Sequence, residues 1–197
     1  MTSTYPCISC TITILCDIDG TLVENGATIP RAVWAVSKLR RLGLKLRFLT
    51  NTSRKPPELI YRMLQDLGFD IETVKIENSV TVCASMLFEQ VNNSVWLLVP
   101  EAVHHLFDHC PKSTREPDFV VITDVREGFT YAPMNEAYLE IIGGAQIVAP
   151  HPTRFSYDDS SQHHLDSGAF IAGLEFGTEK EAIVTGKEST LLVGDNM

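Results

Sequence analysis

Two aspartates, Asp17 and Asp19, stand two positions apart directly after a short apolar run at residues 12–16. A β-rich run that ends so abruptly predicts a buried parallel strand. Ligands of such sheets bind beyond the carboxyl ends of the strands, so both carboxylates are expected to face one ligand. Two close carboxylates resist joint ionisation unless a cation lies between them, and Mg²⁺ suits that arrangement. A plain turn, in which Gly20 allows the sharp bend, is the alternative.

A second apolar run at residues 44–49 ends in the small polar residues Thr50 and Asn51. The hydroxyl, the amide and the start of a following helix together predict a cradle for an anion, because the first turn of a helix has free N–H groups. Ser53 as a simple helix N-cap is the alternative, and both roles are compatible.

Two further polar residues follow apolar runs near the end of the chain. Lys187 comes after residues 183–186 and is suited to neutralise a phosphoryl oxygen, while Asp195 comes after residues 191–194 and is suited to complete a magnesium shell. Each signal is weak alone. Four polar clusters that each follow an apolar strand converge on one edge of one sheet, which predicts a single site.

The elements that must position these residues alternate between strand and helix. Helical patterns start near Pro30 and near Pro56, and they end at Gly43 and Gly68 respectively, which are the expected start and stop signals. Strand, helix, strand and helix at this spacing indicate a parallel, Rossmann-like α/β sheet wrapped by helices.

The middle of the chain predicts a second α/β unit. We expect a core module at residues 11–91 and 167–197, with an inserted α/β cap at residues 92–166. The polar stretch "YDDSSQHH" is expected to be a loop or a hairpin tip. The expected strands of the cap are residues 95–99, 119–123 and 145–149; its expected helices are residues 102–107 and 134–142. After the cap we expect a helix at residues 167–175 and a strand at 182–184.

Composition narrows the class of function. The 197 residues have a formal net charge of −9, which argues against binding nucleic acid or an anionic membrane surface, because both need clustered Lys and Arg. Five scattered cysteines follow no framework spacing, so we expect reduced thiols. We therefore expect a cytoplasmic protein, with the nucleus left open.

The motifs together resemble those of the haloacid dehalogenase (HAD) superfamily. The stretch "DIDGTL", the pair Thr50-Asn51, Gly186-Lys187 and "GDN" at residues 194–196 are similar to its four motifs. An α/β cap between the second and third motifs is similar to the NagD-like branch. Within it, "GAFIAGLEFGTEKEAIVTGK" resembles the phosphatases of phospholysine, phosphohistidine and inorganic pyrophosphate. The similarity runs from about residue 12 to the last residue.

The resemblance implies a role for each motif residue. Asp17 would be the nucleophile that forms an aspartyl-phosphate, and Asp19 would protonate the leaving group and then activate water. Thr50 and the Asn51 backbone would hold phosphoryl oxygens.

The remaining motif residues would manage charge. Lys187 would offset negative charge on the substrate, and Mg²⁺ would be held by Asp17, Asp19 and Asp195. The substrate would be a small phosphorylated molecule or a phosphoamino acid, and the cap would shape its entry and could mediate a homodimer.

One spacing departs from the family pattern. Lys187 and Asp195 are eight residues apart, whereas two parallel strands need a crossover of roughly a dozen or more residues. We therefore expect a chain that is shortened between these motifs and at its end. The alternative function is a catalytically impaired remnant that binds phosphate or associates through its cap; a receiver-type phospho-accepting aspartate fits less well, since a receiver needs no cap.

Overall fold

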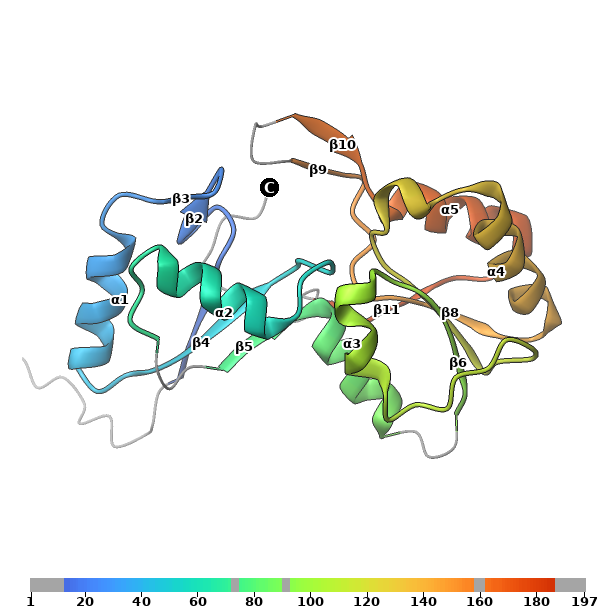
Figure 1. Cartoon of the computed structure of the whole chain (residues 1–197), viewed down its shortest axis with the longest axis horizontal. Helices are drawn as coiled ribbons and strands as arrows, with labels where there is room; N and C mark the ends of the chain where they lie inside the picture. Colours follow the sequence, from blue (N-terminus) through green and yellow to red (C-terminus); the bar gives the residue numbers. More distant parts are fainter. Residues whose placement is uncertain (1–12, 72–74, 90–92, 158–161, 187–197) are drawn as a thin grey trace, which may run out of the picture.

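The computed structural model of the protein describes residues 13–71, 75–89, 93–157 and 162–186. Two α/β modules lie side by side along the longest axis of the molecule, one at the left and one at the right of Figure 1. Each module is built on its own sheet, and the alternation of strands and helices expected from the sequence is confirmed.

The first sheet contains three parallel strands in the order β1 (Thr13–Asp17), β4 (Lys45–Thr50) and β5 (Lys75–Asn78). Their register aligns Asp17 with Leu49 and Thr50 with Asn78, so the polar ends of all three strands meet at one edge. A short hairpin of β2 (Val23–Glu24) and β3 (Ala27–Thr28) follows β1 and was not expected from the sequence.

Two helices cover one face of this sheet. Helix α1 (Ala32–Arg41) and helix α2 (Pro57–Asp66) form one apolar cluster with the strands, centred on Phe48 of β4, which is fully buried. Leu15 and Leu49 lie at alternate positions and are only half-buried, and they are not part of that cluster. Among the described residues, helices therefore pack on one face of the first sheet.

The second sheet contains four parallel strands in the order β11 (Ile183–Val184), β8 (Gln146–Ala149), β7 (Phe119–Ile122) and β6 (Val95–Leu98). All four residues of β7 are buried, as expected for a central parallel strand with both faces covered.

Side chains of β7 alternate between two apolar clusters on opposite faces of the sheet. Phe119 and Val121 pack with helix α3 (Ser79–Phe88) and the 3₁₀-helix η1 (Glu101–Phe107). Val120 and Ile122 pack on the other face.

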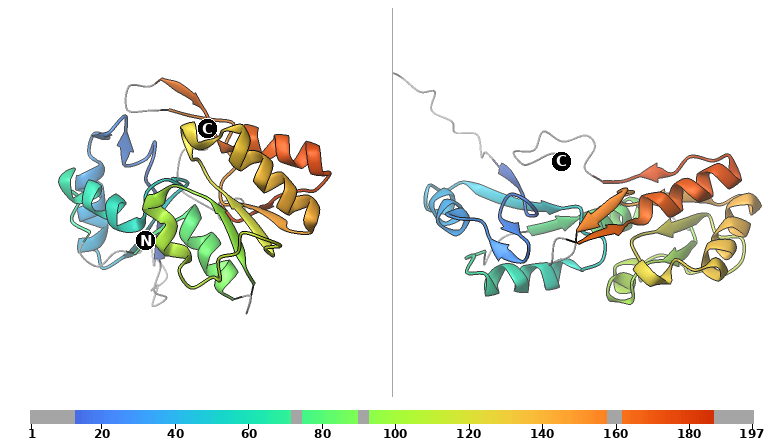
Figure 2. Two further views of the ribbon diagram at one scale, coloured as in Figure 1. Left: turned by 45° about the vertical axis from the view of Figure 1, so that its right-hand side comes forward. Right: turned by 90° about the horizontal axis from the view of Figure 1, so that it is seen from above.

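That other face is covered by helices α4 (Tyr131–Gly143) and α5 (Ser167–Thr178). Figure 2 shows the same layering from two further directions. Two short elements complete the module: the 3₁₀-turn η2 (Arg126–Gly128) and a projecting hairpin of β9 (Phe155–Tyr157) and β10 (His163–Leu165).

The packing departs from the expected boundaries of the cap. Helix α3 lies in the part of the chain that we assigned to the first module, yet its buried residues belong to the second core. Helix α5 packs against α4, and β11 pairs with β8, so residues 167–184 also join the second sheet. Periodicity predicts which face of a helix or strand is apolar. It does not predict which of the two sheets packs on that face, because both sheets have apolar faces.

No helix within the described ranges is long and apolar enough to cross a membrane.

Candidate active site

The end of β1 presents two carboxylates on the same side of the chain. Ile18 is 1% exposed and its N–H donates to the carbonyl of Leu49, so the residue between the aspartates anchors the chain in the first core. Asp17 is half-buried and Asp19 is exposed. The alternation of inward and outward residues at the end of a strand explains how Asp17 and Asp19 both face away from the core.

A tight loop closes directly after the second aspartate. The N–H groups of Leu22 and Val23 both donate to the carbonyl of Ile18, and the N–H of Gly20 donates to the carbonyl of Val23. Gly20 has φ = 75°, a left-handed conformation that glycine adopts without steric cost. The loop is therefore a defined structure that fixes the direction of Asp19.

Thr50, at the end of the neighbouring strand, holds the second aspartate. Its hydroxyl donates a 2.6 Å hydrogen bond to Asp19 Oδ2 and accepts one of 3.0 Å from the N–H of Thr52. Thr50 is 3% exposed, so this hydroxyl is a fixed part of the structure. The structure brings together Asp17, Asp19 and Thr50 as the sequence predicted, and it adds an anchoring role for Thr50 that the sequence did not show.

The loop after β4 leads into a helix that starts where the sequence predicts. Helix α2 begins at Pro57 with Pro56 as its N-cap and no side-chain cap, so the alternative of Ser53 as that N-cap is wrong. Proline has no N–H, so the first turn of α2 offers fewer donors to an anion than we expected. Any anion bound here would depend on the loop at residues 51–55 rather than on the helix.

Two buried polar residues that we did not single out hold this loop. Asn78 ends β5 and caps α3 through a capping box with Thr81, and its Nδ2 donates to the carbonyl of Lys55 at 2.8 Å. The hydroxyl of Ser79 donates to the carbonyl of Asn51 at 3.1 Å. The sequence signal was present, since Asn and Ser directly precede an apolar helical run.

A third residue that we did not single out, Asp124, lies two positions after the end of β7, just as Asp19 lies two positions after the end of β1. It is 3% exposed, and its carboxylate forms a 3.0 Å ion pair with Arg126. Burial, the largest effect, and the nearby Asp166 raise the pKa of Asp124, while Arg126 and Arg54 oppose that rise. An acidic residue directly after an apolar strand is the signal that could have identified it.

Two predicted site residues, Lys187 and Asp195, lie outside the described residues. Among the residues that are described, no three His, Cys, Asp or Glu side chains group as a metal site. The oxygens of Asp17 and Asp19 are hard donors of the kind that Mg²⁺ prefers, and the buried Oδ1 of Asn51 has no hydrogen-bond partner in the described structure. The residues present therefore fit a divalent cation. They supply only some of its ligands, and other groups would have to supply the rest.

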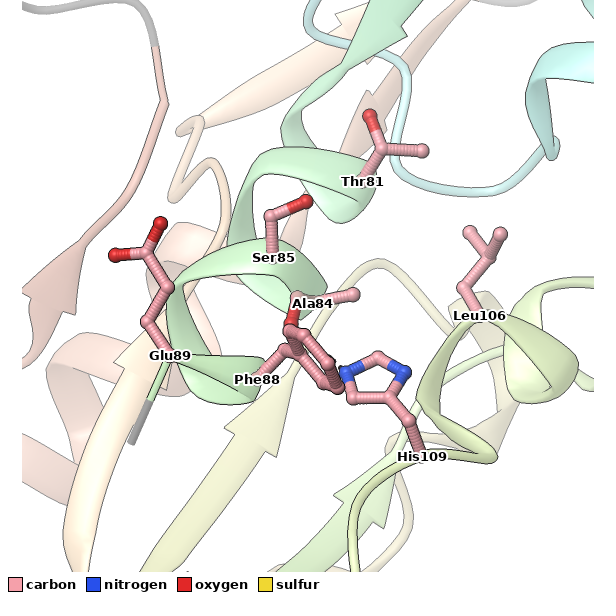
Figure 3. A pocket seen from close by; sticks show the side chains of 7 residues that line it. All are labelled: Thr81, Ala84, Ser85, Phe88, Glu89, Leu106 and His109. Carbon is pink, nitrogen blue, oxygen red and sulfur yellow. Dashed lines mark hydrogen bonds between the residues drawn. The ribbon is translucent and has the colours of Figure 1, made fainter. Parts of the chain in front are cut away.

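A separate hollow of about 280 Å³ lies on the second module between α3 and η1. Figure 3 shows Phe88 and His109 in contact at its centre, with ring centroids 5.1 Å apart. His109 also bonds to the carbonyl of Ala84, and His104 to that of Val99, so both imidazoles have structural partners. None of the aspartates at the end of β1 lines this hollow.

Comparison with known proteins agrees with the fold and with the family that the motifs resemble. A sequence profile of haloacid dehalogenase-like hydrolases matches residues 14–110. Haloacid dehalogenase-like hydrolase domain-containing protein 2 of Bos taurus is 32% identical over 200 residues, covering 93% of this chain and 76% of that protein. The Bos taurus phospholysine phosphohistidine inorganic pyrophosphate phosphatase is 35% identical over 189 residues, covering 89% of this chain and 66% of that protein.

Solved structures show the same architecture. NagD from Escherichia coli K-12 superposes with a TM-score of 0.80 at 23% identity, covering 90% of this chain and 70% of that one. A glycerol phosphate phosphatase from Mycobacterium tuberculosis, solved in complex with magnesium, has a TM-score of 0.78 at 24% identity, covering 89% of this chain and 54% of that one.

The parallel α/β modules of this chain have the fold of NagD. The chain belongs to the haloacid dehalogenase-like hydrolase family. It spans about two thirds of the length of the curated phosphatase that it matches.

Proposed function

We propose that this chain is a magnesium-dependent phosphatase that acts through an aspartyl-phosphate on Asp17. The observation that carries the proposal is the arrangement at the ends of β1 and β4: Asp17 and Asp19 project from one turn, and the hydroxyl of Thr50 fixes Asp19 at 2.6 Å. A nucleophile beside an oriented acid–base group is what a two-step phosphoryl transfer requires.

In the first step, a carboxylate oxygen of Asp17 attacks phosphorus. A new oxygen–phosphorus bond forms as the bond to the leaving group breaks, and Asp19 donates a proton to the departing atom. The hydrogen bond from Thr50 to Oδ2 of Asp19 orients that carboxyl group, so the proton is delivered from a defined side.

In the second step, the phosphoryl group passes to water. Asp19, now a carboxylate, takes a proton from the attacking water, and the bond between phosphorus and Asp17 breaks to release inorganic phosphate. A bound Mg²⁺ would supply positive charge for the phosphoryl oxygens, with the carboxylate of Asp17 and the backbone carbonyl of Asp19 among its ligands. Lys187 remains our candidate for further positive charge, and Asp195 remains our candidate for a further magnesium ligand.

The substrate class follows from relatives and from charge. One relative is named for phospholysine, phosphohistidine and pyrophosphate, and we extend that class to this chain as a proposal, together with small phosphate esters. The net charge of −9 argues against nucleic acid and anionic membranes as partners, and it leaves room for a local cationic site that holds a small anionic substrate. A cytoplasmic location and a homodimer formed through the second module belong to the same proposal.

The test is release of phosphate from an aryl phosphate by the purified full chain, with and without Mg²⁺. Asp17→Asn should abolish release, because the amide is neither a nucleophile nor a good magnesium ligand. Asp118→Asn is the matched control, since Asp118 precedes β7 and bonds to Ser94, within the second module. Release that survives Asp17→Asn, or that needs no divalent cation, would overturn the proposal.

A further inference from the structure

Asp124 occupies the boundary between the two modules. It follows β7 at the carboxyl end of the second sheet, and only 3% of it is exposed. Its Oδ1 accepts a 3.0 Å hydrogen bond from the N–H of Arg126, and its Oδ2 lies 3.0 Å from Arg126 Nε. A buried carboxylate keeps its charge only with such partners, so Arg126 is held in place by Asp124.

On one side, Asp124 contacts the loop that follows the catalytic strand β4. Its N–H donates to the hydroxyl of Ser53 at 3.4 Å, and its carboxylate lies 3.8 Å from the guanidinium of Arg54. Ser53 is buried and lies three positions after Thr50. A shift of this loop would therefore reach the hydroxyl that orients Asp19.

On the other side, the same carboxylate is connected to the projecting hairpin. Arg126 Nη2 donates a 3.1 Å hydrogen bond to the hydroxyl of Ser156 on β9. The hairpin extends from the second module at the top of Figure 1, and its side chains Phe155 and Tyr157 are half-exposed and in mutual contact. With little apolar surface of its own to bury, a two-stranded hairpin depends on such tethers for a defined position.

We propose that Asp124 is a positioning residue that couples the loop at residues 51–55 to the β9–β10 hairpin. Through Ser53 and Arg54 it touches the loop, and through Arg126 it holds Ser156 of the hairpin. The two segments are more than 90 residues apart in the sequence, and this polar chain joins them. The coupling itself is a property of the structure; its effect on turnover rests on the proposed phosphatase function.

The other charged side chains around Asp124 include both positive and negative groups. Arg54 and Arg126 carry positive charge, while Asp166, the N-cap of α5, is the second buried carboxylate near it. Removing the negative charge of Asp124 leaves two arginines facing each other without their shared partner. The ion pair with Arg54 and the anchored position of Arg126 should then weaken together, since both depend on one carboxylate, while the hydrogen bond from the Asp124 N–H to Ser53 is kept.

The experiment is hydrogen–deuterium exchange of the full chain, read by mass spectrometry on peptides from the loop and from the hairpin. Asp124→Asn, which keeps the shape and removes the charge, should raise exchange about tenfold in both segments. Asp118→Asn is the matched control: it makes the same change at the opposite end of β7 and should leave both segments as in the parent chain.

Two further variants, one of them one-sided, keep the test decisive if Asp124→Asn is poorly folded. Ser156→Ala should raise exchange in the hairpin while leaving the loop unchanged, and Arg126→Gln should raise it in both. Changes confined to residues 123–128 in Asp124→Asn and Arg126→Gln would overturn the proposal, as would no change in either segment.

A kinetic measurement separates positioning from mere structure. If the chain is active, Asp124→Asn should lower kcat for an aryl phosphate about tenfold with little change in KM, because the acid–base group is misplaced rather than removed. Unchanged kcat in a folded Asp124→Asn protein that shows the exchange effect would contradict this role in turnover. A parent chain without activity would overturn the proposed function alone, since the exchange result is independent of it.

Discussion

The hydroxyl of Thr50 lies 2.6 Å from the carboxylate of Asp19 and joins the ends of two adjacent parallel strands. The same hydroxyl accepts the N–H of Thr52, so its single proton is directed to Asp19. This contact joins the aspartate motif after β1 to the Thr50-Asn51 motif after β4 within one site. It also makes Thr50 the residue through which other parts of the molecule act on the acid–base group.

Replacing Thr50 with valine keeps the shape of the side chain and removes the proton that orients Asp19. We expect kcat for an aryl phosphate to fall by roughly tenfold to a hundredfold, while the free energy of unfolding changes by about 1 kcal/mol. Steady-state kinetics and urea unfolding measure the two effects. Thr52→Val is the control, because Thr52 contributes its backbone N–H; equal loss of kcat in both variants would show that the hydroxyl of Thr50 is not special.

Gly20→Ala should destabilise the protein by about 1 kcal/mol or more, because Gly20 has a φ of 75° that is strained for any residue with a Cβ. Gly173→Ala is the matched control within α5, where an added Cβ meets nothing within 4 Å. That change should stabilise by up to about 1 kcal/mol, since alanine favours helix. Urea midpoints that move in the same direction for both variants would refute the assignment of strain to Gly20.

The raised pKa of Asp124 predicts how the stability of the protein changes with pH. The folded state binds the proton of Asp124 more tightly than the unfolded state does. The contribution of Asp124 to the free energy of unfolding therefore falls as pH rises from its unfolded pKa, about 3.9, through the raised folded pKa. Asp124→Asn cannot titrate and should lack that loss. The variant should therefore gain stability relative to the parent chain as pH rises through this window.

Urea unfolding at several pH values from 3.5 to 7 would measure that difference. Asp118→Asn again provides the comparison: hydrogen bonds from Ser94 lower the pKa of Asp118, so its carboxyl group affects stability only below the unfolded pKa and should give no change as pH rises from about 4 to 7. A difference for Asp124→Asn that stays flat across the window would show that the folded pKa of Asp124 is not raised.

Cys83 should resist thiol reagents in the native protein. Burial, the largest effect, raises its pKa to about 12, so almost no thiolate exists near neutral pH. We expect no alkylation of Cys83 by iodoacetamide at pH 8 until the chain is unfolded in urea, as followed by peptide mass mapping. Rapid native alkylation of Cys83 would mean that α3 does not pack on the second sheet as described.

The local patterns were sufficient for most elements and for the first half of the site. An apolar run that stops at an aspartate predicted β1 and both carboxylates, and the Gly43 and Gly68 stop signals predicted where α1 and α2 end. The β2–β3 hairpin, β5 and α3 were missed. Strands β2 and β3 have two residues each, which is too short for an alternation of side chains to be visible. Helix α3 is apolar around most of its surface, so it shows no clear helical period.

The sequence by itself determined the residue types, the strand ends at which Asp17, Asp19 and Thr50 stand, and membership of a hydrolase family. Those properties are local, because they depend on the period of apolar residues and on which residues end a strand. Only the tertiary structure decided that Thr50 bonds to Asp19, that α3, α5 and β11 join the second sheet, and that Asp124 reaches Ser53. These contacts join residues far apart in the chain, so they depend on how the two sheets pack and not on any pattern within one segment.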